Sequence, residues 1–88
     1  MLEVTLVLTN KLGLHARPAA EIMKTASKFK SRVTLHGNGK VIDAKSIIMV
    51  MSLGIKNGER LTIKAEGTDE VECIKALTEL FRNNFNEE

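Results

Sequence analysis

The chain has few of the residues that mark several large protein classes. It contains three Phe but no Trp or Tyr, so we do not expect an aromatic stacking platform for single-stranded nucleic acid. A net charge of +2 lacks the strong basicity that is typical of nucleic-acid binding. This weak charge is compatible with a local basic face that meets an acidic protein. We therefore expect no nucleic-acid partner.

Cysteine and long apolar runs are also scarce. The single cysteine, Cys73, excludes an internal disulfide and indicates a reducing compartment. No apolar run approaches the roughly 20 residues that span a bilayer, and the opening Met-Leu-Glu-Val-Thr lacks the basic segment of a signal peptide. We expect a cytoplasmic location, no direct membrane insertion, and one domain that comprises residues 1–88.

Alternating apolar and polar residues predict four strands. The strands are expected at 2–9, from Val33, around Val41–Ile42, and at Arg60–Glu66. Between the second and third, Gly37-Asn38-Gly39 contains the Asn-Gly pair favoured in tight hairpin turns. Half-buried alternating strands favour an antiparallel or mixed sheet with helices on one face, which is an α+β fold.

Helical spacing predicts three helices, which complete the order βαββαβα. The first has Pro18 in its first turn, and from there its apolar positions are Ala19, Ile22, Met23, Ala26 and Phe29. The second covers 46–53, with Ser46 as N-cap and Gly54 after its end, although periodicity also allows a buried strand here. The third is capped by Thr68 and has the apolar stripe Val71, Ile74, Leu77, Leu80, Phe81 and Phe85.

The hexapeptide 13–18, Gly-Leu-His-Ala-Arg-Pro, carries most of the functional information. It places His15 where a strand gives way to a helix, with Pro18 in the first turn, where a missing N–H costs nothing. The unpartnered N–H groups and the helix dipole form an anion site there, and they favour a neutral, nucleophilic imidazole. A phosphoryl group on His15 would be bound by the N–H groups of Ala16 and Arg17 and by the Arg17 guanidinium.

Simpler interpretations apply to His15 and to the other reactive side chains. A lone histidine at a helix start is usually a surface or capping residue, and an enzyme that uses His15 as general base lacks a nucleophile or second acid/base. His36 is interpreted as a surface histidine, and Cys73 as an unreactive thiol beside acids. Asp43 and the acids at 69–72 are expected in turns and caps. No residues show metal-ligand spacing.

Two segments resemble a known family. Residues 13–20, Gly-Leu-His-Ala-Arg-Pro-Ala-Ala, are similar to the active-site signature of HPr, the histidine-containing phosphocarrier of the phosphoenolpyruvate-dependent sugar phosphotransferase system. Residues 44–48, Ala-Lys-Ser-Ile-Ile, and 50–54, Val-Met-Ser-Leu-Gly, are similar to that family's regulatory serine region. The resemblance covers essentially the whole chain. It implies an HPr-like open-faced β-sandwich, with a four-stranded antiparallel sheet and three helices on one face.

The resemblance also implies a function. His15 would take phosphate on Nδ1 from phosphorylated enzyme I and give it to a histidine of an enzyme IIA domain for sugar uptake, while Arg17 steadies the phosphoryl group. Such a protein is a monomeric carrier, not an enzyme, and needs no metal or cofactor of its own. In HPr proteins of low-GC Gram-positive bacteria, the serine equivalent to Ser46 is phosphorylated by HPr kinase/phosphorylase. That phosphoprotein recruits a transcriptional regulator in carbon catabolite regulation.

The expected partner surface combines the helix start at His15 with the short helix. Its predicted members are Leu14, Ala20, Lys24, Lys28, Ile47, Ile48 and Met51, with Arg17 and Lys45 completing a basic rim. On the short helix, Ile47, Val50 and Met51 could equally face the core. Ile48 and Met49 enlarge or stiffen this helix, because many HPr proteins carry methionine and glycine there. Leu12 is similar to the nitrogen-related branch of the family, so a regulatory paralogue without sugar transport is the alternative function.

Overall fold

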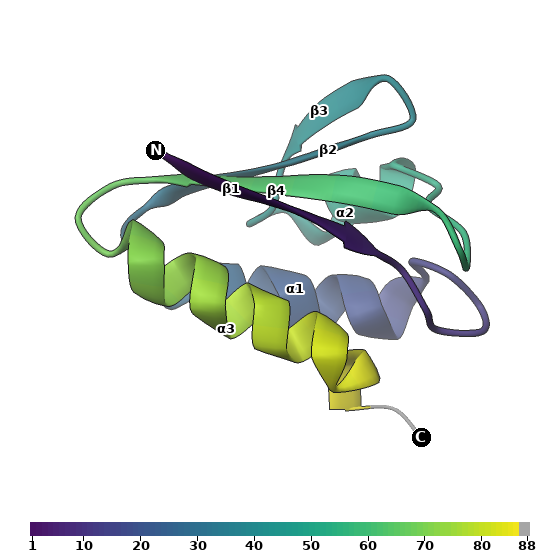
Figure 1. Cartoon of the computed structure of the whole chain (residues 1–88). Helices are drawn as coiled ribbons and strands as arrows, with labels where there is room; N and C mark the ends of the chain where they lie inside the picture. Colours follow the sequence, from purple (N-terminus) through teal and green to yellow (C-terminus); the bar gives the residue numbers. More distant parts are fainter. Residues whose placement is uncertain (87–88) are drawn as a thin grey trace.

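The computed structural model describes residues 1–86, and its elements follow the predicted order (Figure 1). Residues 87 and 88 of the expected domain lie outside the described residues. The strands are β1 (Leu2–Val7), β2 (Arg32–Gly37), β3 (Lys40–Asp43) and β4 (Arg60–Glu66). The helices are α1 (Ala16–Ser27), α2 (Ile47–Ser52) and α3 (Glu70–Arg82), and the short 3-10 turn η1 (Asn84–Asn86) follows them.

The four strands form one antiparallel sheet in the order β1-β4-β2-β3. All three helices lie on one side of this sheet, and the other side is uncovered (Figure 1). The predicted open-faced β-sandwich is therefore confirmed. Strand β4 shows why the helices take one side: Leu61, Ile63 and Ala65 are buried, while the residues between them are not. On the uncovered side, the hydroxyls of Thr5 and Thr62 lie 2.8 Å apart.

The hairpin between β2 and β3 turns as the Asn-Gly pair predicts. Asn38 and Gly39 both have positive φ, +48° and +75°, which is the geometry of a type I′ turn. The same hairpin also holds the end of α2. The Asn38 amide donates to the carbonyl of Leu53 (2.7 Å), and Lys40 Nζ donates to that of Ser52 (2.8 Å). These side chains satisfy carbonyls that have no partner within the helix.

Residues 46–53 form a helix and not the buried strand that periodicity also allowed. Ser46 is its N-cap, as predicted, and its Oγ accepts the Met49 N–H at 3.4 Å. Before it, the Asp43 carboxylate accepts the Lys45 N–H at 2.9 Å, so Asp43, the last residue of β3, starts the turn that leads to α2. The helix is short because Gly54 follows Leu53 with a φ of +65°.

Several predicted element ends are wrong. Strand β1 stops at Val7, short of the expected Thr9. Helix α1 starts at Ala16, which places Pro18 in its first turn as predicted, but it ends at Ser27, so Phe29 lies beyond it. Helix α3 starts at Glu70 with Asp69, not Thr68, at the N-cap. There Glu70 Oε1 accepts the Gly67 N–H at 3.1 Å, which closes the turn before the helix.

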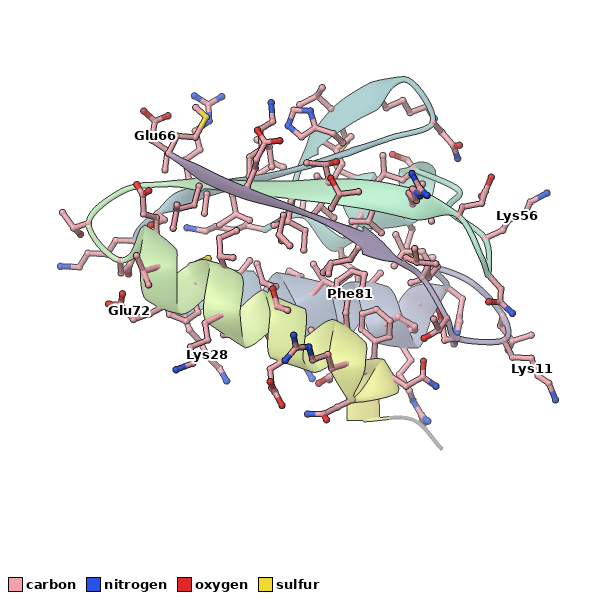
Figure 2. The ribbon with its side chains drawn as sticks, viewed as in Figure 1. Lys11, Lys28, Lys56, Glu66, Glu72 and Phe81 are labelled. Atoms are coloured by element: carbon pink, nitrogen blue, oxygen red, sulfur yellow. The ribbon has the colours of Figure 1, made fainter. Side chains whose placement is uncertain are left out.

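The predicted stripe of α3 is correct except near its two ends. Val71 is 61% exposed because it lies two residues from the buried Cys73, and two positions turn a helix by about 200°. Phe85 is buried but lies in η1 beyond the helix, where its ring packs edge-on against Phe81 with centroids 4.7 Å apart. Phe81 itself points from α3 toward the sheet (Figure 2).

A carboxylate ties the start of α3 to the loop after α1. Asp69 accepts the backbone N–H groups of Lys30 (2.8 Å) and Ser31 (2.9 Å), together with the Ser31 hydroxyl. The hydroxyl bond first, and then the Lys30 amide bond, lower the pKa of Asp69 below its ordinary value. These bonds join two loops that lie far apart in the sequence, and the Ser31 side chain at the junction is fully buried.

We expect Asp69→Asn to lower the thermal midpoint at pH 7 by several degrees and to weaken its acid dependence. Because the folded-state pKa is depressed, the contribution of Asp69 is present above about pH 4 and is lost as the pH falls through the folded-state pKa. Calorimetry at pH 7 and at about pH 3 tests this expectation. Glu72→Gln, an exposed change in the same first turn, is the control (Figure 2). Equal losses in both variants at pH 7 would contradict the role of Asp69.

Candidate functional site

The loop that carries His15 is tied to the chain segment before β4. Leu8 N–H donates to Glu59 O (2.9 Å), and Gly58 N–H donates back to Leu8 O (2.7 Å). Six residues later, Leu14 N–H donates to the carbonyl of Ile55 at 2.9 Å. The loop between β1 and α1 is thereby held at both ends, and the start of α1 is fixed relative to the sheet.

Gly13 is required where this loop passes Ile55. Its φ of +74° is a region that other residues rarely adopt. A Cβ at this position would lie 2.8 Å from Ile55 O, which is too close for backbone to tolerate without moving. The glycine of the hexapeptide therefore allows the close approach that brings the next two residues to the helix start.

His15 is the N-cap of α1. Its backbone is extended, with φ −87° and ψ −170°, and its carbonyl accepts the first helical bond from Ala19 N–H at 3.0 Å. Its own N–H donates to Gly13 O at 2.9 Å. The imidazole is half-buried and makes no capping bond to the helix. The side chain is therefore not used to cap the helix that it begins.

The first turn of α1 leaves two backbone donors available to a ligand. Of the four N–H groups without a helical partner, that of His15 is bonded to Gly13, and Pro18 has none. Ala16 and Arg17 remain, and both residues are exposed. Within α1, all of which is described, the first turn carries no acidic residue. The helix start therefore offers two N–H groups, an arginine and the positive end of the dipole to an anion.

The predicted docking residues divide into accessible and buried groups. On α1, Lys24 is exposed and Ala20 is half-buried. Lys28, the C-cap of α1, is also exposed, and Figure 2 shows it pointing away from the sheet. Leu14 was expected on this surface, but it is 6% exposed and belongs to the core. The reason is its backbone bond to Ile55, which turns the residue inward. Leu12, two residues earlier, is 77% exposed.

Helix α2 packs against α1 and presents a mixed surface. Ile48 is 76% exposed, and Met49 and Met51 are also exposed. Of the residues whose direction was left open, Val50 is buried, Met51 faces outward, and Ile47 is half-buried against the core. Lys45 contributes little to the expected basic rim, because its Nζ donates to Phe29 O at 2.9 Å and the residue is half-buried.

The other reactive side chains lie apart from His15. His36 is on β2, where its Nε2 lies 3.0 Å from Thr34 Oγ1. Cys73 is fully buried, and burial first, then the charge of Asp69, raises the pKa of its thiol. An unreactive thiol is thus consistent with the prediction, but burial and not the nearby acids is the main cause.

Within residues 1–86, no group of three acidic, His or Cys side chains is placed to hold a metal. No helix in the described part of the chain is long and apolar enough to cross a membrane.

One residue near the site has no place in the sequence-based prediction. Asn10 is 2% exposed, and its side chain bonds to the backbone of the loop that carries His15. The sequence could have indicated this residue, because Asn followed three residues later by Gly is a pattern that is typical of a type I turn. The observed Gly13 N–H to Asn10 O bond of 3.2 Å closes that turn.

Comparison with known proteins agrees with this geometry. Residues 2–83 match the family model described as the PTS HPr component phosphorylation site. The chain belongs to the HPr family of phosphocarriers. It is 48% identical over 88 residues to the phosphocarrier protein HPr of Xylella fastidiosa (strain 9a5c), covering 100% of this chain and 99% of the relative. It is 44% identical over 77 residues to that of Mycoplasma capricolum subsp. capricolum, covering 88% and 86% of the two chains.

Solved structures give the same relationship. HPr-C-His from Thermoanaerobacter tengcongensis superimposes with a TM-score of 0.95 at 50% identity, covering 100% of this chain and 99% of that chain. Crh, described as the catabolite repression HPr of Bacillus subtilis, has a TM-score of 0.75 at 37% identity in a form described as a swapped dimer, with 94% of this chain and 95% of that chain covered. Dimers are therefore known among the relatives of this chain, whereas the sequence led us to expect a monomer.

We expect Gly13→Ala to be more destabilising than Gly39→Ala. The two glycines have nearly the same φ, +74° and +75°, so the cost of positive φ, about 1–2 kcal/mol, is shared. Only a Cβ at Gly13 meets backbone, since nothing lies within 4 Å of one at Gly39. The clash with Ile55 O adds about 1–3 kcal/mol to Gly13→Ala. Urea unfolding of both variants measures the difference. Equal losses in the free energy of unfolding would show that the loop can move away from Ile55 at little cost.

Proposed function

We propose that residues 1–88 act as one phosphocarrier domain of the sugar phosphotransferase system. In this proposal His15 accepts a phosphoryl group on Nδ1 from phosphorylated enzyme I and passes it to enzyme IIA domains. The observation that carries the proposal is the N-cap position of His15, beside two available N–H groups, in a chain of the HPr family. The chain is a carrier and not an enzyme, because the proteins on either side supply the catalytic machinery.

The proposed transfer moves one PO3 group and leaves the helix in place. The lone pair of the neutral imidazole Nδ1 attacks phosphorus, and the donor's bond to phosphorus breaks with its electron pair returning to the donor. The N–H groups of Ala16 and Arg17 and the Arg17 guanidinium then bind the dianion. The helix dipole contributes about 0.3–1 kcal/mol to such an anion. That amount favours the phosphorylated state without trapping a group that must move on.

The proposed partner surface combines Ala20 and Lys24 of α1 and its C-cap, Lys28, with the exposed side of α2. Helix α2 supplies Ile47, Ile48 and Met51, of which Ile48 is the most exposed. Apolar side chains beside lysines suit partners with an apolar patch and an acidic rim. Methionine adapts to differently shaped partners, as a protein that meets both enzyme I and enzyme IIA requires.

Ser46 is proposed as a regulatory phosphorylation site for HPr kinase/phosphorylase. Its Oγ is half-buried and its bond to Met49 N–H is long, 3.4 Å, so modification disturbs only a weak cap. A phosphate at this position adds negative charge beside Ile47 and the surface of α2. That charge would repel an acidic enzyme I and favour a transcriptional regulator with a basic site.

Incubation with enzyme I and phosphoenolpyruvate should place one acid-labile, base-stable phosphate on the wild-type chain and none on His15→Ala. His36→Ala is the matched control, because it removes the other histidine, which lies on β2 away from α1. Mass spectrometry of the intact proteins at alkaline pH measures the modification. A wild-type chain that stays unmodified would overturn the carrier function.

Onward transfer separates the two family branches. Phosphate that moves from this chain to a sugar-specific enzyme IIA domain supports transport. Phosphorylation without such transfer would instead favour the nitrogen-related regulatory paralogue, for which the exposed Leu12 is the supporting feature.

Ser46→Asp should slow phosphorylation of His15 by enzyme I, on the order of 10-fold at low salt, through a slower association. Ser46→Asn has the size of the aspartate variant and keeps the capping ability of serine but adds no charge, so its rate should remain near that of the wild type. Raising the ionic strength from about 0.05 M to about 0.5 M should shrink the difference, because salt screens exposed charges. Initial rates at both salt concentrations test this account. A defect that Asn shares would point to the larger side chain instead of the charge and would contradict this account.

A further inference from the structure

Asn10 is a buried polar side chain beside the loop that carries His15. It is 2% exposed, and Ser31 is the other buried polar residue in the part of the chain that the structure describes. Burying an amide is unfavourable unless it forms hydrogen bonds, so its position has to be explained by its partners. Ser31 joins two loops through Asp69, at the other end of α1. Asn10 lies instead in the loop before α1, which leads to His15.

Asn10 engages both polar backbone groups of Gly13. Its Nδ2 donates to Gly13 O at 2.6 Å, and its own carbonyl accepts Gly13 N–H at 3.2 Å. The same Gly13 carbonyl accepts the N–H of His15 at 2.9 Å. One oxygen therefore receives both the buried amide of Asn10 and the backbone N–H of the phosphorylated residue.

Gly13 cannot shift to compensate for a lost bond without disturbing its surroundings. A Cβ added at Gly13 would lie 2.8 Å from Ile55 O, so the backbone passes close to Ile55, and the next N–H, that of Leu14, is bonded to Ile55 O. The direction of the Gly13 carbonyl is then set by Asn10, and that carbonyl orients the peptide that enters His15. The extended N-cap conformation of His15 follows from this peptide, and with it the position of the imidazole beside the N–H groups of Ala16 and Arg17.

We propose that Asn10 is a positioning residue for phosphoryl transfer at His15. Through Gly13 O it holds His15 so that the imidazole and the first N–H groups of α1 face the same phosphoryl group. The inference rests on the proposed carrier function and adds a residue to it. Because Asn10 is buried, it does not touch a partner protein, so it acts on the transfer step and not on docking.

The test uses Asn10→Ala and Asn10→Leu as substrates of enzyme I with phosphoenolpyruvate. Leucine fills nearly the same volume but cannot donate, which keeps a stable variant available if alanine unfolds. We expect kcat to fall on the order of 10-fold, since small misplacements of reacting groups are costly, while KM for the carrier changes by less than about twofold. The amide NMR signal of His15 should shift in both variants, because its acceptor has moved.

Ser31→Ala is the matched control. It removes the hydrogen bond of the other buried polar side chain, and about 18 Å of helix separates it from His15. It should lower stability and leave kcat and the His15 amide signal unchanged. Asn10 variants that keep the wild-type kcat, or lose no more of it than Ser31→Ala, would overturn the positioning role alone. A wild-type chain that takes no phosphate would overturn the carrier function and this inference together.

Discussion

The start of helix α1 depends on the contact between the loop after β1 and the segment before β4. Leu14 N–H reaches Ile55 O, and a second pair of bonds links Leu8 to Gly58 and Glu59. Only a glycine at position 13 permits this approach, since a Cβ would meet Ile55 O at 2.8 Å. The contact buries Leu14 and turns the following residue to the surface, where the helix begins. The position of His15 is therefore set by backbone bonds to the sheet segment and not by contacts of the imidazole alone.

This arrangement suits a group that must be received and released. A helix start stabilises an anion by a small amount, through N–H groups that need no rearrangement when the phosphoryl group arrives. Pro18 has no N–H and the His15 N–H is bonded to Gly13 O, so the N–H groups of Ala16 and Arg17 are the ones that we propose for the phosphoryl group. A deep site with many donors would hold the phosphate more firmly and would slow its departure. The short list of donors is thus part of what a carrier needs.

The sequence predicts the features that depend on local patterns. The alternation in Arg60–Glu66 gave the bounds of β4, and the Asn38-Gly39 pair gave the hairpin, because both follow from residues near one another. Features that depend on distant contacts were missed. Thr is a residue type that commonly caps helices, so Thr68 was predicted as the N-cap. The helix instead starts at Glu70, and Asp69 at its N-cap bonds to the loop at Ser31. Leu14 was expected on the surface because nothing local reveals its bond to Ile55.

Asn10 shows the same limit within the candidate site. The hexapeptide names the histidine, the arginine and the donors, because their chemistry can be recognised one residue at a time. In our proposal, what orients them is a buried amide that lies outside the motif and acts on His15 through the Gly13 carbonyl. A residue of this kind orients a backbone carbonyl. Such a role can be recognised only when the hydrogen-bond donors and acceptors of the folded chain are known. In the proposed carrier mechanism, the motif supplies the groups that react, and the turn that precedes it determines their orientation.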